Sequence, residues 1–157
     1  MRKRMIGRES EQAEEVAHNW LNLEEIAEAE LSSELESYPI EMALNPQSAS
    51  HWQAAEAGEQ TIRLRFDQAQ DIKMIRLLFN ADSEARTQEF VLRCSTDGGN
   101  SYQDIARQQY NFSPPDAMCE LENYHVDLHA VTTLELVIIP NISGGSARAS
   151  LSQWLLA

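Results

Sequence analysis

Apolar and polar residues alternate along most of the chain after residue 26, which is the pattern of strands that bury one face. In residues 61–66, Ile62, Leu64 and Phe66 share one face, whereas Arg63 and Arg65 share the other. The same alternation predicts strands at 90–95, 121–128 and 133–139. Residues 72–79 are apolar on both faces apart from Lys73 and Arg76, which is typical of a more central strand, and further strands are predicted at 102–112 and 149–156. With a first strand within 26–33, these segments give about eight strands.

Turn-forming residues separate the predicted strands. Asp97-Gly98-Gly99-Asn100 is typical of a hairpin turn, and Ser113-Pro114-Pro115-Asp116 ends the following strand because proline cannot donate a ladder hydrogen bond. Residues 34–59 are interpreted as a loop with short extended pieces, and residues 140–146 as a second loop. We expect the core to contain Ile62, Leu64, Phe66, Phe90, Leu92, Leu134 and Leu136, and Tyr124, Val126 and Leu128 to face inward.

A helix is expected at residues 10–23, before the strands begin. Its early glutamates suit a helix N-terminus, and Ala13, Val16, Trp20 and Leu23 form an apolar stripe. Such a short helix needs packing for stability, so we expect it to lie on the sandwich with Trp20 as its most buried member. Residues 26–33 could prolong the helix, but their alternation favours a strand.

These elements predict an all-β fold, a jelly-roll β-sandwich of about eight mainly antiparallel strands with an N-terminal helix. Strands joined by turns, with one clear helix, favour two packed sheets over a parallel sheet covered by helices. The predicted organisation is a tail and acidic amphipathic helix at residues 1–25, followed by one sandwich domain at residues 26–157.

Charge and composition exclude several classes of partner. The net charge of −13 and pI near 4.6 oppose binding to nucleic acid or to an anionic membrane surface. The start carries positive charge but no apolar segment of a signal peptide, and the chain has only two cysteines, Cys94 and Cys119. We therefore expect a cytoplasmic protein with free thiols, Cys94 being buried, and either a monomer or a homodimer.

Catalytic motifs are missing from the sequence. It contains no Gly-x-Ser-x-Gly elbow, no phosphate-binding loop and no dinucleotide fingerprint, so we expect no enzyme activity and no cofactor. His125 and Asp127 share a strand face with His129 close by, and two such residues could chelate a metal. We favour the solvated face of a half-buried strand, and for Asp97 the conformational demand of a hairpin over a calcium site.

Four loop stretches carry side chains suited to ligand recognition. They are His51-Trp52, Asp82 with Arg86, Tyr110-Asn111, and Asn141. Stacking rings, amides and a cation recognise sugars or peptide groups, and loops at one end of a sandwich are the usual place for them. Packing against the core is the competing interpretation for Trp52 and Tyr110.

From about residue 33 the order of features resembles the galactose-binding-like jelly rolls, the superfamily that includes discoidin or coagulation factor V/VIII type C domains and many carbohydrate-binding modules. The resemblance rests on Trp52 before the strand at 61–66, the strand at 72–79, the turn Ser95-Thr96-Asp97-Gly98, and the closing segments 134–140 and 149–156. The stretch Gln-Gln-Tyr-Asn-Phe-Ser-Pro at 108–114 is also similar to one in a family of uncharacterised bacterial proteins.

This resemblance implies the fold and a general binding role, since ligands in the superfamily include sugars, lipid heads, nucleic acid and proteins. Our first hypothesis is a non-catalytic binding module with carbohydrate as the leading ligand class. The alternative is an intracellular domain that binds a protein partner, which the start of the chain and its helix favour.

Overall fold

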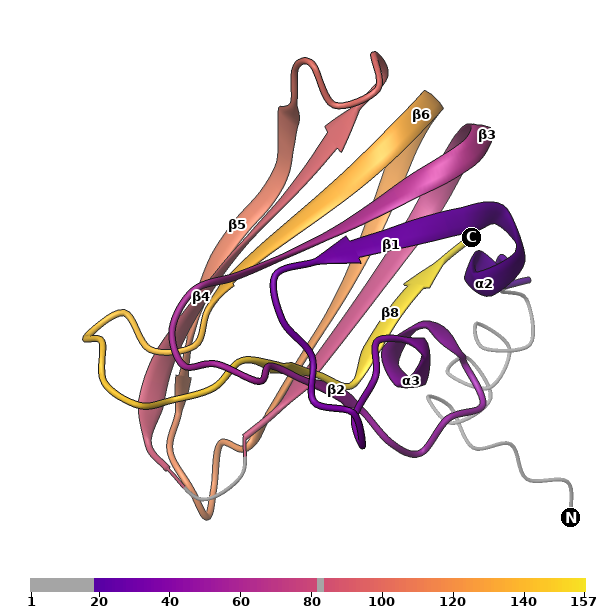
Figure 1. Cartoon of the computed structure of the whole chain (residues 1–157). Coiled ribbons are helices and arrows are strands. Elements are labelled where there is room, and N and C mark those ends of the chain that lie inside the picture. Colours follow the sequence, from indigo (N-terminus) through magenta and orange to yellow (C-terminus); the bar gives the residue numbers. More distant parts are fainter. Residues whose placement is uncertain (1–18, 82–83) are drawn as a thin grey trace, which may run out of the picture.

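Two long strands, β3 (Gln60–Asn80) and β6 (Cys119–Ile139), bend and take part in both layers of the fold (Figure 1). This is seen in a computed structural model that describes residues 19–81 and 84–157. The other strands of this described part are β1 (Ala27–Leu31), β2 (Trp52–Gln53), β4 (Arg86–Ser95), β5 (Gln103–Phe112), β7 (Ser150–Leu151) and β8 (Gln153–Leu156). Its two short helices are α2 (Leu23–Ile26) and α3 (Glu41–Leu44).

The strand pairing builds two antiparallel layers. In one layer, β1 pairs with the first half of β3, which pairs with the second half of β6, followed by β4 and β5. In the other, β8 pairs with the second half of β3, which pairs with the first half of β6. The β3–β6 register is irregular between Arg65 and Met74, where both strands bend. The predicted jelly-roll β-sandwich is confirmed.

The core lies between these layers and follows the alternation seen in the sequence. All seven residues expected in the core are buried, with Phe66 the most exposed of them at 9%. Trp52 and Trp154 are fully buried, and full burial of an aromatic side chain stabilises a fold by several kcal/mol relative to a cavity. Tyr124, Val126 and Leu128 pack on the core as partly buried residues, and Cys94 is buried, as predicted.

The prediction of an N-terminal helix at residues 10–23 differs from the structure at its C-terminal end. Residues 10–18 lie outside the described residues, and 19–22 are not helical, so the predicted end of the helix is wrong; α2 begins at Leu23 instead. The Leu21 amide donates to the Leu156 carbonyl of β8 at 2.8 Å, which ties this stretch to the edge of β8. Leu23 is 2% exposed and Trp20 only half-buried, so the expectation for Trp20 is also wrong.

Three segment boundaries also differ from the sequence prediction. The expected loop at 34–59 contains the helical turn α3 as well as the short strand β2. The strand expected at 149–156 is divided into β7, which pairs with β2, and β8, which pairs with β3. The pairs of strands expected at 61–66 and 72–79, and at 121–128 and 133–139, are continuous through the bends.

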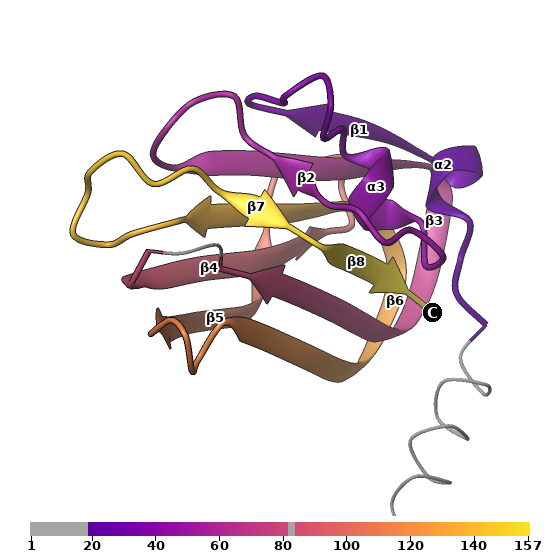
Figure 2. The ribbon, with the colours of Figure 1, turned by 90° about the horizontal axis from the view of Figure 1, so that it is seen from below.

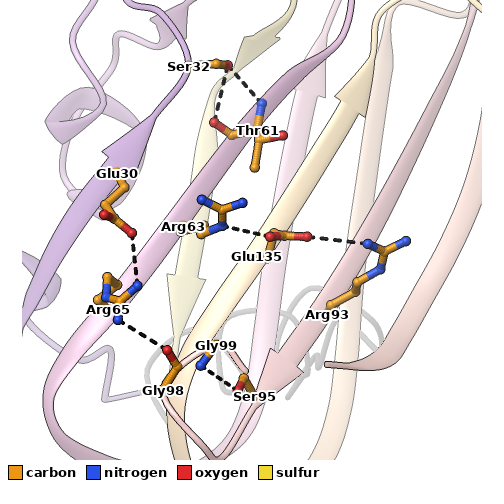
Figure 3. Close-up of polar contacts among 10 residues, drawn as sticks. All are labelled: Glu30, Ser32, Thr61, Arg63, Arg65, Arg93, Ser95, Gly98, Gly99 and Glu135. Carbon is orange, nitrogen blue, oxygen red and sulfur yellow. Dashed lines mark hydrogen bonds and ion pairs between the residues drawn. The ribbon is translucent and has the colours of Figure 1, made fainter. Parts of the chain in front are cut away.

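The outer face of the β1–β5 layer carries a ladder of ion pairs (Figure 3). Glu135 accepts a hydrogen bond from Arg63 Nε at 2.8 Å and another from Arg93 Nη1 at 3.4 Å. Arg65 contacts Glu30 on the neighbouring strand at 3.3 Å. Alternation therefore leaves a charged face outside and an apolar face inside.

Within the described residues, no helix has the length and apolar character needed to cross a membrane.

Candidate binding hollow

The lower end of the sandwich in Figure 1 gathers the end of β3, the start of β4, the connections that follow β5 and β6, and the segment before β2. Figure 2 looks onto this end from below. We call it the loop end. The bends of β3 and β6 form the opposite end. At the loop end, residues near positions 50, 86 and 148 lie close together although they are far apart in the sequence.

The loop end contains a hollow of about 470 Å³, here called the larger hollow. Its polar lining includes His51, Gln53, Asn80, Glu84, Arg86 and Arg148. Ser50, Ser150 and Ser152 add hydroxyl groups. A concave surface with several convergent donors and acceptors is typical of a site for a small polar ligand.

His51 is held in this wall by its neighbours. Its ring stacks on Tyr38, with 4.5 Å between centroids and 19° between planes, and its Nε2 lies 3.5 Å from Gln53 Oε1. The next residue, Trp52, anchors the segment because its ring is fully buried and its Nε1 donates to the Ser33 carbonyl at 3.2 Å. A buried anchor beside a half-exposed ring fixes the position of the ring.

Arg86 begins β4 and is 9% exposed. Its Nη1 donates to the Pro140 carbonyl at 2.7 Å and to Gln88 Oε1 at 3.2 Å. The guanidinium also lies 4.7 Å from the centre of the Phe112 ring. These contacts fix the guanidinium in place, and Arg86 is one of the residues that line the larger hollow.

A second hollow of about 400 Å³ lies on another side of Arg86. Asn111 and Asn141 both line it. Asn111 Oδ1 accepts a hydrogen bond from Thr87 Oγ1 at 2.6 Å, and Asn141 Oδ1 accepts one from the Ser143 amide at 3.1 Å. Arg86 is the residue shared by the two hollows.

The structure thus brings four of the six predicted site residues to the two hollows: His51, Arg86, Asn111 and Asn141. Trp52 lines neither hollow and packs in the core. Tyr110 is half-buried with its ring edge-on to Phe112 at 4.9 Å. Asp82 lies outside the described residues.

Arg148 is a hollow residue that the sequence did not single out. Its side chain is exposed and forms no ion pair with a described residue. The only signal in the sequence was its position just after the Gly144-Gly145 loop. Nothing in the local pattern showed that this loop would lie beside residue 51.

A second unpredicted feature lies inside the sandwich near the same end. Glu120 is 2% exposed, and its Oε1 accepts a hydrogen bond from Gln88 Nε2 at 3.3 Å. Burial, together with the charge of Glu122, raises the pKa of Glu120 to about 7. The pKa of Glu122 is also raised by burial. The predicted inward face of 121–128 could have shown this, because Glu120 and Glu122 share the parity of Tyr124.

The candidate metal ligands lie at the opposite end or on the outer surface. His125 and Asp127 are exposed, which confirms the solvated strand face. His129 Nε2 lies 3.0 Å from Asp127 Oδ1 and its Nδ1 3.7 Å from Asp71 Oδ1. In the described ranges, no three His, Cys, Asp or Glu side chains are grouped so that they could hold a metal ion.

Asp97 organises the β4–β5 hairpin. Its carboxylate accepts hydrogen bonds from Ser101 Oγ at 2.6 Å, from Ser95 Oγ at 2.6 Å and from the Ser101 amide at 2.9 Å. These bonds lower the pKa of Asp97 to about 2. The hairpin interpretation of this segment is confirmed.

Comparison with known proteins is informative at the level of family and fold. A model of the F5/8 type C domain matches residues 28–120. No curated protein matches the sequence. Among solved structures, a family 32 carbohydrate-binding module of NanJ from Clostridium perfringens, in complex with galactose, has a TM-score of 0.65 at 12% identity, with 87% of this chain and 96% of that one covered.

Two further modules of family 32 are similar. One from Clostridium perfringens, in complex with GalNAc-beta-1,3-galactose, has a TM-score of 0.62 at 19% identity over 88% of this chain and 99% of that chain. The module of AlyQ, in complex with 4,5-unsaturated mannuronic acid, has a TM-score of 0.61 at 15% identity over 89% and 98%. At such identities the likeness shows the shared fold.

Proposed function

Because the chain belongs to the F5/8 type C domain family, we propose that it is a non-catalytic carbohydrate-binding module whose sugar occupies the larger hollow. The observation that carries this proposal is the convergence of His51, Arg86 and several amide and hydroxyl groups on one hollow at the loop end. Sugar-bound modules of the same fold support it.

The lining suits the hydroxyl groups of a sugar. An imidazole held by stacking on Tyr38 and a guanidinium held by Pro140 and Gln88 are already fixed before a ligand enters. Preorganised donors and acceptors reduce the entropy lost on binding. The neighbouring second hollow gives room for a further sugar unit beside Arg86.

Binding without hydrolysis is favoured by the acids at the site. Glycoside hydrolysis generally uses a pair of carboxyl groups on either side of the scissile bond. Among the described residues that line the larger hollow, Glu84 is the one carboxylate. The hollow therefore fits recognition better than catalysis.

Calorimetric titration with galactose, N-acetylgalactosamine and polygalacturonate tests the proposal. We expect at least one of them to bind, and His51→Ala to weaken that binding by about tenfold or more, since the imidazole is a wall of the hollow. His129→Ala is the matched control, because His129 is exposed at the opposite end and its loss should leave the affinity unchanged.

Binding that both histidine variants retain would place the sugar elsewhere. A protein that binds none of the sugars would contradict the proposal and leave the protein-partner hypothesis. The cytoplasmic location, the monomeric or homodimeric state and the division at residues 25 and 26 remain predictions.

A further inference from the structure

A polar cluster inside the sandwich has no role in holding sugar. Glu120 and Glu122 project inward from β6, and Gln88 of β4 and Gln108 of β5 lie next to them. The Tyr124 hydroxyl contacts the Gln108 amide. Glu120 is buried and Glu122 partly buried. Two neighbouring carboxyl groups in such surroundings need either a cation or a proton, since a buried carboxylate without a compensating partner is costly.

The contacts favour a proton. Among the described residues, Glu120 Oε2 is fully buried and has no hydrogen-bond partner. A carboxylate would leave this oxygen without a donor and would face a second carboxylate on the same strand. The Glu120 and Glu122 side chains are within hydrogen-bonding reach of each other, so a protonated Glu120 can donate to the Glu122 carboxylate.

Glu122 has the surroundings of the ionised member. With the Gln108 amide turned so that its nitrogen faces Glu122, that nitrogen lies 3.0 Å and 3.1 Å from the two carboxylate oxygens. The same nitrogen contacts the Tyr124 hydroxyl. A donor amide on both oxygens stabilises a carboxylate, so one proton between the two acids leaves every group partnered.

Hydrogen bonds connect this pair to the binding hollow. Gln88 Nε2 donates to Glu120 Oε1 at 3.3 Å, and Gln88 Oε1 accepts from Arg86 Nη1 at 3.2 Å. Arg86 lines both hollows. The charged or titratable groups that act on Glu120 are Glu122 and Tyr124 on β6 and Arg86 on β4. Its hydrogen bond from Gln88 comes from an uncharged amide, as does the contact of Glu122 with Gln108 of β5.

We propose that Glu120 and Glu122 hold one proton between them, and that losing this proton weakens sugar binding because the new charge draws Arg86 away from the wall of the hollow. The coupling rests on the proposed carbohydrate-binding function. Ionised Glu120 repels Glu122 and attracts the Arg86 guanidinium through the single intervening amide of Gln88. Both effects displace the residue that the two hollows share.

Infrared difference spectroscopy tests the proton itself. The wild-type protein should show a protonated carboxylic acid band at pH 6 that disappears at pH 8.5, because burial raises the Glu120 pKa to about 7. Glu120→Gln, which keeps shape and hydrogen bonding to Glu122, should lack the band. Glu122→Gln is a second variant, which removes the other acid of the pair. Glu89→Gln on the outer face is the matched control, which should keep the acid band.

Titration with a binding sugar at pH 6 and pH 8.5 tests the coupling. We expect the wild-type affinity to fall roughly fivefold or more between these values, and the affinity of Glu120→Gln to stay constant. A missing acid band at pH 6 overturns the carboxyl pair. An intact band with equal affinity at both pH values overturns only the coupling.

A further outcome separates this inference from the proposed function. If the band is present but no sugar binds at either pH, the carboxyl pair stands while the binding function and the coupling both fail. If the band is missing at pH 6 and added calcium raises the melting temperature, a cation occupies the cluster and the proton is the wrong assignment.

Discussion

Glu135 and Glu120 are almost equally buried, at 5% and 2% exposure, and their surroundings are opposite. Glu135 sits on the outer face between Arg63 and Arg93 (Figure 3). Glu120 sits inside the sandwich, where its direct hydrogen bond comes from the uncharged amide of Gln88. The two side chains therefore lose a similar amount of water and gain different partners.

The difference shows how a buried acid is compensated. The hydrogen bond between Arg63 and Glu135 is the main cause of a raised Arg63 pKa, which means that the ionised pair is favoured there. At Glu120 burial dominates and the pKa rises toward neutrality, which means that the neutral acid is favoured. Arginine cations compensate the charge of the buried acid on the outer face, and a bound proton removes the charge of the buried acid in the interior.

The largest expected effect comes from breaking the interior site with Glu120→Gln. The folded pKa of Glu120 is raised from 4.5 to about 7, so its contribution to stability is complete below pH 4.5 and is lost as pH rises through 7. The difference between these two pKa values corresponds to about 3 kcal/mol in the free energy of unfolding. We expect urea unfolding to show a wild-type protein that is less stable at pH 8 than at pH 5.

In the same measurement, Glu120→Gln should be more stable than wild type at pH 8 and similar to it at pH 5. Glu89→Gln should retain the wild-type slope, because Glu89 lies on the other face of the sheet and pairs with Arg107. A Glu120→Gln protein that is less stable than wild type at pH 8 would contradict the assignment of the proton to Glu120.

Glu135→Gln should change the free energy of unfolding in the opposite direction from Glu120→Gln, and by a smaller amount. The substitution removes the carboxylate that accepts from both Arg63 and Arg93, whose side chains are 43% and 33% exposed and regain water. We expect a loss of about 1–2 kcal/mol that is the same at pH 5 and pH 8. Urea unfolding at the two pH values measures it, and a gain in stability would show that the ladder is unfavourable.

The same two carboxylates show how far the sequence could be used. Alternation at 61–66 and 133–139 predicted which residues face the core, because a strand has a strict period of two. Applied to 121–128, the same period puts Glu122 on the face of Tyr124, although only Tyr124, Val126 and Leu128 were predicted to face inward. The sequence could not predict the hydrogen-bond partners of the two interior acids. Gln88 and Gln108 come from other strands, whose register is set by the whole sheet.

The hollow was predictable to a similar degree. His51, Arg86, Asn111 and Asn141 were predicted as binding residues in loops. Arg86 and Asn111 instead lie at the ends of strands β4 and β5, and all four residues line one of the two hollows. Long-range packing decides which of these residues line which hollow. It also places Arg148 in the same hollow as His51. The helix boundary near residue 20 was wrong because a backbone bond to Leu156 outweighs local helical preference.

The smallest expected effect concerns a third carboxylate, Asp97, which completes the comparison because it is exposed and has neither a cation nor a proton as its partner. Hydrogen bonds from Ser101 and Ser95 lower its pKa from 3.8 to about 2. A lowered pKa contributes stability above pH 3.8 that is lost as pH falls toward 2, a window well below that of Glu120. Asp97→Asn should therefore lower the melting temperature slightly and equally at pH 5 and pH 8, and the difference from wild type should shrink only in acid. Differential scanning calorimetry at these pH values would measure it. A pH dependence between 5 and 8 in Asp97→Asn that differs from wild type would mean that the hairpin and the interior acid pair are coupled, and that the three carboxylates are not independent.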